Sequence, residues 1–236
     1  MRTVIGFPAR LGLAGLASLL VATQVGAADA KTRYPEMAPV DQYLTERNEE
    51  IALARSAAPP SIANEADVWV LTRHGYEVAA HGKNGFVCLV ERGWTAGVGD
   101  PDFWNPKLRG PLCLNAPAVR TYLPLTVKKT ELVLAGRTRT QMADAISAAV
   151  AKGELPKIES GAMCYMLSKQ GYLSDSDGHW HPHLMFFLPA TDVATWGVGA
   201  AGSPVLGTKN TVDQVTTFLV TVAQWSDGSS DTGPHH

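Results

Sequence analysis

Three of the chain's seven histidines lie within five residues of one another, in the stretch GHWHPHLMFFLP at residues 178–189. His179, His181 and His183 alternate with a tryptophan and with Pro182. Side chains two positions apart share one face of an extended strand, so this spacing puts the three imidazoles on the same side. Pro182 favours extended backbone at the residue before it but cannot donate a ladder hydrogen bond, which indicates the start of a strand or a sheet edge.

The spacing of the histidines limits how they can bind a metal ion. Residues two apart in a strand are separated by roughly 6.6 Å and residues four apart by roughly 13 Å, whereas a zinc–nitrogen bond is about 2.0–2.1 Å long. One ion can therefore be held by an adjacent pair of imidazoles but not by all three. We predict a divalent ion, zinc or copper, at His179, His181 and Asp177. Further candidate ligands are Asp175, His74, His81 and Cys164. The alternatives are polar surface histidines at the mouth of a hairpin, or a catalytic histidine that works without a metal.

Residues 93–115 are the second stretch of interest, because glycine, proline, aspartate and asparagine dominate it while bulky aromatic residues are embedded among them. Loops of this length are uncommon in compact domains and are often functional. We predict a ligand pocket between this loop and the hairpin that carries the histidines, since pockets combine apolar walls with a few placed polar groups. The predicted ligand-binding residues are Trp94, Trp104, Trp180 and His183. The alternative is that the aromatic residues pin the loop over the core.

The strands that must position these residues are indicated by β-branched and aromatic runs between turn signals. The first three form a predicted meander, with a hairpin turn at Asn84-Gly85 between the second and the third. A second hairpin has the histidines at its open end, and a final strand follows. The predicted strands span residues 67–73, 76–81, 86–91, 161–168, 183–188 and 211–224.

Apolar residues at helical spacing predict helices over residues 39–57 and 137–152, with a shorter one around 126–134. Local hairpins combined with these helices predict an α+β fold. We expect a single domain, residues 31–236, with a mainly antiparallel sheet of about six strands and helices packed on one face. The tail from about residue 226 is expected to be flexible.

The first thirty residues have the pattern of a signal peptide. Arg2 and Arg10 form a charged start before an apolar run at residues 11–21. Ala28-Asp29-Ala30 matches a cleavage site. The run is shorter than the roughly 20 residues needed to cross a bilayer. We therefore predict a periplasmic or secreted protein, cleaved after Ala30.

Three cysteines are informative in an exported chain, because thiols outside the cytoplasm tend to oxidise. A bridge between Cys88 and Cys113 would tie the loop at residues 93–115 to the sheet. Cys164 lies in an apolar stretch and is predicted to be a buried thiol. Spacing alone leaves the pairing open.

Charge and missing motifs narrow the function. The formal charge of −2, without any run of lysine or arginine, argues against nucleic-acid binding. There is no G-x-S-x-G elbow and no H-E-x-x-H zinc motif. The leading hypothesis is an exported protein that binds a small ligand or a metal ion near the GHWHPH stretch. The alternatives are a metal-dependent periplasmic hydrolase that uses His179 or His181 with Asp175 or Asp177, and a structural or partner-binding envelope protein.

Overall fold

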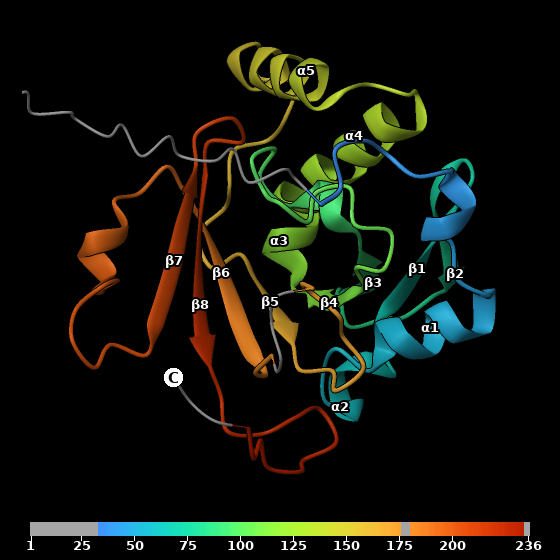
Figure 1. Cartoon of the computed structure of the whole chain (residues 1–236). Helices are drawn as coiled ribbons and strands as arrows, with labels where there is room; N and C mark the ends of the chain where they lie inside the picture. The colour runs from blue at the N-terminus through green and yellow to red at the C-terminus, as the bar shows by residue number, and fades with distance from the viewer. Residues whose placement is uncertain (1–32, 176–179, 234–236) are drawn as a thin grey trace, which may run out of the picture. The chain divides into compact units, whose positions relative to one another are not determined.

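The computed structural model describes residues 33–175 and 180–233, which leaves the predicted signal peptide outside the described residues. Four strands precede the three helices that lie within residues 116–151, and four strands follow those helices (Figure 1). The strands are β1 (Asp67–Thr72), β2 (Gly75–Ala80), β3 (Val87–Glu91), β4 (Gly110–Leu114), β5 (Met163–Met166), β6 (His183–Pro189), β7 (Val205–Asn210) and β8 (Val215–Thr221). The α-helices are α1 (Arg47–Arg55), α2 (Pro60–Ala63), α3 (Ala116–Thr121), α4 (Leu123–Leu134) and α5 (Arg139–Ala151). The 3-10 helices are η1 (Val40–Tyr43), η2 (Gly93–Thr95) and η3 (Val193–Trp196).

All eight described strands belong to one sheet, in the order β2-β1-β3-β4-β5-β6-β8-β7. Every neighbouring pair is antiparallel except β1 and β3, which are parallel. The prediction of a single α+β domain with a mainly antiparallel sheet is confirmed. The described sheet has eight strands where about six were expected.

The first three strands do not form the predicted meander. β3 pairs with β1 and not with β2, so Asn84-Gly85 is not a hairpin turn. The connection instead folds back on the turn before β1: the backbone N–H groups of Lys83 and Asn84 donate to the Glu65 carbonyl. A Cβ atom at Gly82 would lie 2.2 Å from that same carbonyl oxygen, so only glycine permits this close approach.

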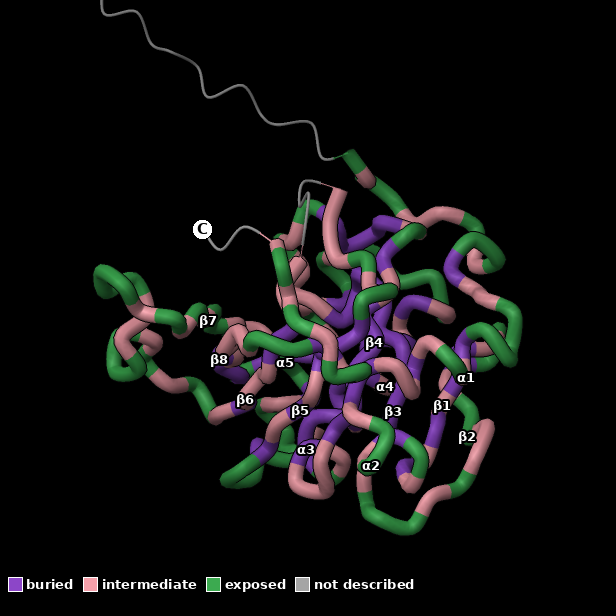
Figure 2. The backbone as a smooth tube through the Cα atoms, turned by 90° about the horizontal axis from the view of Figure 1, so that it is seen from below, coloured by how far each residue is buried: buried purple, intermediate pink, exposed green. Residues whose placement is uncertain are grey.

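The strand β4 lies within the stretch that the sequence indicated as a loop. It pairs along its whole length with β3, but with β5 only through Cys113 and Leu114. Pro111, which cannot donate a ladder hydrogen bond, lies in the part of β4 that pairs with β3 alone. β3 and β4 are buried throughout, and Figure 2 shows them at the centre of the fold with the sheet end at β7 more exposed.

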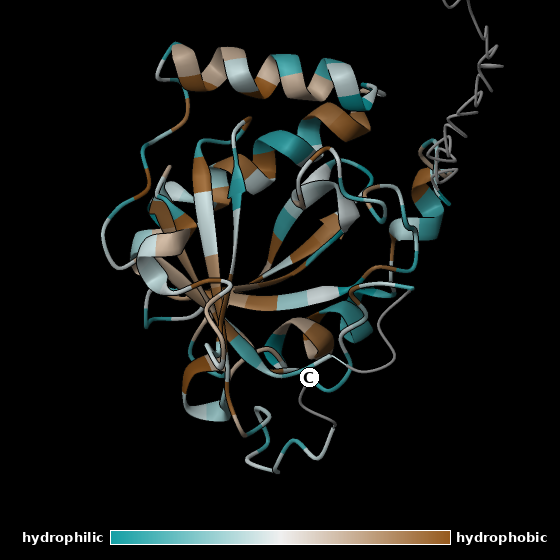
Figure 3. Ribbon diagram, turned by 60° about the vertical axis from the view of Figure 1, so that its left-hand side comes forward, coloured by the Kyte–Doolittle hydropathy of each residue, from teal (hydrophilic) through white to brown (hydrophobic). Residues whose placement is uncertain are grey.

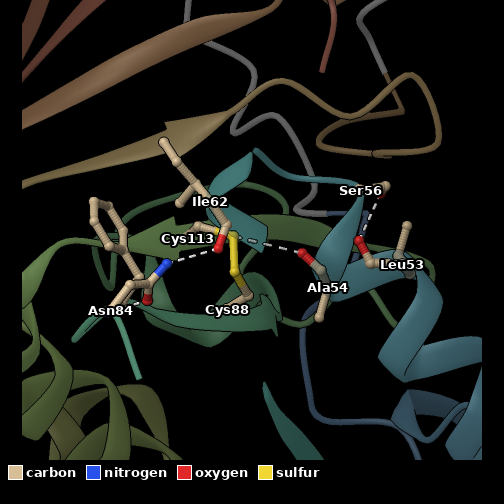
Figure 4. The surroundings of a disulfide bond; sticks show 8 residues. Leu53, Ala54, Ser56, Ile62, Asn84, Cys88 and Cys113 are labelled. Carbon is tan, nitrogen blue, oxygen red and sulfur yellow. Dashed lines mark hydrogen bonds between the residues drawn. A yellow bond between two sulfur atoms is a disulfide. The ribbon is translucent and has the colours of Figure 1, made fainter. Parts of the chain in front are cut away.

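Cys88 and Cys113 face each other across β3 and β4 and form a disulfide. Figure 4 shows the Sγ of Cys113 near the Ala54 carbonyl of α1, at 3.8 Å. Small side chains of α1 and α2, such as Ala54 and Ala63, pack on this face and allow the helices to approach closely. A buried disulfide is typical of proteins that fold in an oxidising compartment.

The helices cover both faces of the sheet, and not one face as expected. Val90 and Cys113 face α1, whereas Leu89 and Leu112 lie one position away and face α3 and α4. Figure 3 shows α4 lying between α5 and the sheet. No helix in the described part of the chain is long and apolar enough to cross a membrane.

Candidate functional site

A groove of about 680 Å³ lies on the face of the sheet that carries α3 and α4. Its walls are residues 95–100, from the connection after η2, and residues 208–213, from the end of β7 and the turn into β8. Its floor is formed by residues of β3, β4, β5, β6 and β8. The floor residues are Glu91, Gly110, Met166, His183, Met185, Val215, Thr217 and Leu219.

The strand register explains why these floor residues share one face. Met166 is paired with His183, and Met185 is paired with Leu219. Directly paired residues project to the same side of a sheet. Each strand therefore sends alternate side chains into the groove, as the sequence predicted for β6.

Gly110 keeps the floor open beside Glu91. A Cβ atom at this position would lie 3.4 Å from Leu173 and 3.5 Å from Met166, which is ordinary van der Waals contact. Its backbone is not in the left-handed region, so an added Cβ brings neither a clash nor backbone strain. A branched side chain at position 110 would project into the groove.

Glu91 is a carboxyl group at the inner end of the groove, and only 7% of the residue is exposed. One carboxyl oxygen accepts a hydrogen bond of 2.9 Å from the Thr126 hydroxyl. Burial raises the pKa of Glu91, and hydrogen bonds from Thr126 and Thr95 only partly oppose this rise. Burial is thus the largest influence on this carboxyl group.

The ion pair between Lys129 and Asp213 holds the two walls together. The Nζ of Lys129 donates to Asp213 at 2.6 Å, to the Thr95 carbonyl at 2.9 Å and to the Ala96 carbonyl at 3.1 Å. Burial raises the pKa of Asp213, and the attraction of Lys129 opposes the rise. One lysine on α4 thus fixes both the connection after η2 and the turn before β8.

A second buried ion pair lies at the end of β3. Arg92 borders the groove, and its Nη2 donates to both carboxyl oxygens of Glu50, at 2.9 and 2.8 Å. Its remaining nitrogens donate to the carbonyls of Tyr43 and Val90. Both side chains of the pair are almost completely buried. These charge-assisted hydrogen bonds fix η1 and α1 to the sheet.

His183 is a buried residue on the groove floor. Its Nδ1–H donates to the His181 carbonyl at 2.8 Å, which defines Nδ1 as the protonated nitrogen because a carbonyl can only accept. Burial lowers the pKa of His183. The ring is thus held neutral, with a lone pair on Nε2.

The tryptophans predicted to bind ligand occupy other positions. Trp94 and Trp104 are buried in the core under η1 and α4, and the Trp94 indole donates to the Thr130 hydroxyl at 3.0 Å. Trp180 packs edge-on against Trp225 and His183, and is thus adjacent to a groove residue. None of these three tryptophans is among the residues that line the groove. Their roles as ligand contacts remain predictions.

The predicted metal ligands are only partly within the described residues, since Asp177 and His179 lie outside them. The Nδ1–H of His181 donates to the carboxylate of Asp231 at 2.5 Å. Asp175, the nearby alternative, already accepts hydrogen bonds from several side chains. They are Arg33, Tyr34, Tyr172, Asn105 and Lys107. Residues 33–175 and 180–233 contain no group of three or more histidine, cysteine or acidic side chains placed to hold a metal ion.

Sequence reasoning missed Glu91 and the pair of Lys129 and Asp213, because each is a single charged residue without a recognisable motif. One signal was present in the sequence. Tyr122, Thr126 and Lys129 recur at the spacing of one helix face, with Thr130 beside them, although that face is buried. A polar face on a buried helix indicates partners supplied by distant segments.

No family model matches the sequence, and neither curated proteins nor solved structures show significant similarity to it.

Proposed function

We propose that this protein is exported and binds a small, largely apolar molecule in the groove between the connection after η2 and the turn from β7 into β8. The observation that carries this proposal is the groove of about 680 Å³, floored by Met166, Met185 and Leu219 and flanked by Glu91 and His183. Ligand pockets commonly measure about 300–1,000 Å³ and combine apolar walls with a few placed polar groups.

A second cavity of about 450 Å³ lies on the other side of Asp213 and Val215. It is bordered by an exposed segment around Gly153 and Lys157, at the end of α5. It shares only Asp213 with the buried polar network described above. The larger groove is therefore the better candidate, because two further buried polar groups face it.

Binding is favoured over acid–base catalysis by distance. Glu91 and His183 lie on β3 and β6, which are three strand spacings apart. Neighbouring strands are about 4.8 Å apart, so the two backbones are separated by roughly 14 Å. A general acid and a general base that act on one centre must each come within about 3 Å of it. One ligand can touch both residues at different ends, but a single reacting atom is too small to do so.

Export is supported by the apolar run at residues 11–21, by the Ala28-Asp29-Ala30 cleavage pattern and by the disulfide between Cys88 and Cys113. The destination we propose is the periplasm or the medium.

The binding proposal is tested with N-phenyl-1-naphthylamine, an uncharged dye that fluoresces in apolar sites. We expect saturable binding by the wild type and at least tenfold weaker binding by Gly110→Leu, whose side chain fills the floor. Gly110→Ala is the matched control and should bind within about twofold of the wild type. Unchanged binding by a folded Gly110→Leu protein, or no binding by the wild type, would contradict the proposal.

A second proposal, that the protein binds zinc or copper through His181, is favoured by its contact with Asp231. Metal-ligating histidines usually donate their other ring N–H to a carboxylate or a carbonyl, which orients the ring. Metal content should be measured by mass spectrometry on untagged wild-type protein and on His181→Ala. Near-stoichiometric metal in the wild type alone supports this proposal, and metal-free wild type excludes it.

A further inference from the structure

The buried cations beside the groove are already paired within the protein. The three protons of the Lys129 ammonium are directed to Asp213 and to the carbonyls of Thr95 and Ala96. The Arg92 guanidinium is engaged by Glu50 and by two backbone carbonyls. A carboxylate or phosphate in the groove would therefore lose its hydration without gaining a buried cationic partner, which is costly.

Two buried polar side chains on the groove floor, His183 and Glu91, keep an atom that is not sealed from solvent. Nε2 of His183 has no hydrogen-bond partner among the described residues and is not sealed from solvent. Because Nδ1 carries the proton, Nε2 can only accept. The carboxyl group of Glu91 is hydrogen-bonded to Thr126 and lies beside Thr95, and its second oxygen is not sealed from solvent. Burial raises the pKa of Glu91, and the Lys129 ammonium already supplies a positive charge near this carboxyl group, so this end of the groove does not call for a cation.

We infer that the ligand of this groove is an uncharged, mainly apolar molecule with a hydrogen-bond donor, a hydroxyl or an amide N–H, that binds Nε2 of His183. This inference rests on the proposed function and adds the ligand class. An anion is disfavoured because the buried cations are already paired. The exposed Lys209 does not change this, because it pairs with Thr216, one position from the floor residue Thr217, and so projects to the other face of the sheet. A donor is favoured because the open nitrogen is an acceptor. The floor between His183 and Glu91 supplies apolar contact through Met166 and Leu173.

Displacement of N-phenyl-1-naphthylamine by four ten-carbon competitors tests this inference. Decan-1-ol and methyl nonyl ether are isomers that differ in having a hydroxyl donor, while decanoate and decylammonium carry opposite charges. One net hydrogen bond corresponds to about a fivefold difference in affinity. We expect decan-1-ol to bind about fivefold more tightly than the ether and at least tenfold more tightly than decanoate or decylammonium.

Variants at position 183 separate the hydrogen bond from packing. His183→Phe keeps a ring but removes the acceptor, so the alcohol and the ether should become equal. His183→Gln retains an acceptor and should restore part of the preference, and the exposed His74→Phe serves as the control. Equal displacement of the dye by the alcohol and the ether in the wild type, or tighter binding of either charged competitor, would overturn the inference. The proposed function would still be supported by the binding of the dye itself. Absence of dye binding in the wild type would contradict both the proposed function and this inference.

Discussion

His181 and His183 are two residues apart, yet their rings have different partners. His181 donates to Asp231, which lies fifty positions further along the chain. His183 donates to a backbone carbonyl only two positions away and is almost completely buried. The first ring is oriented by a carboxylate, whereas the second is kept neutral by burial. Their chemistry therefore differs although their sequence context is nearly the same.

The burial of His183 predicts a pH dependence of stability. Its pKa is lowered in the folded protein, whereas the unfolded chain takes up the proton near pH 6.5. The stabilisation from the neutral ring is therefore fully present above about pH 6.5 and is lost as the pH falls through the folded pKa. We expect the free energy of unfolding to fall more steeply below pH 6.5 in the wild type than in His183→Gln. Urea titrations between pH 5 and 8 measure this, and parallel profiles for the two proteins would count against it.

At the scale of elements, α4 connects segments that are distant in sequence. Lys129 binds a turn 84 positions away, and Thr126 binds Glu91, 35 positions before it. The walls of the groove have little regular structure of their own. Their positions depend on this one polar helix face.

The pair of Lys129 and Asp213 should therefore show strong energetic coupling. Asp213→Ala leaves a buried ammonium without its carboxylate, and breaking a buried pair in this way costs about 3–5 kcal/mol. The double variant Lys129→Met with Asp213→Ala removes the unpaired charge and should recover much of that loss. Urea denaturation of the wild type, both single variants and the double variant gives the coupling energy. Additive effects would show that the two side chains do not depend on each other.

The strands found from sequence and those missed differ in a physical way. β1, β6 and β8 are continuous runs of β-branched or bulky apolar residues, which are readily recognised. β4 begins with Gly110-Pro111, and β7 contains Gly207 and polar residues. These two strands are formed by the neighbours they pair with, so their own propensity gives little sign of them.

The same distinction holds for the site. His183 could be placed beside a pocket because alternation along a strand is a local property. Glu91 and Asp213 could not, because their burial depends on α4 and on a parallel pairing of β1 with β3 that the turn at Asn84-Gly85 did not suggest. Long-range topology, and not residue chemistry, limited the prediction.

For the whole molecule, the disulfide joins the two central strands β3 and β4 on the face of the sheet that α1 and α2 cover. Cys88 and Cys113 are both completely buried and are separated by 25 positions. Closing a loop of that size lowers the entropy of the unfolded chain and is worth about 3.5 kcal/mol. Since neither sulfur is exposed, a reductant should reach the bridge mainly after unfolding.

The thiol count links this bridge to the proposed compartment. Chains recovered from the periplasm and unfolded in guanidinium should show one free thiol, Cys164, whereas chains made in a reducing cytoplasm should show three. The variant Cys88→Ala with Cys113→Ala should lose about 3.5 kcal/mol relative to the oxidised wild type in urea, and reduced wild type should lose a similar amount. Three free thiols in the periplasmic protein would mean that the bridge does not form in that compartment. Equal stability of the oxidised and reduced chains would mean that the bridge does not stabilise the sheet.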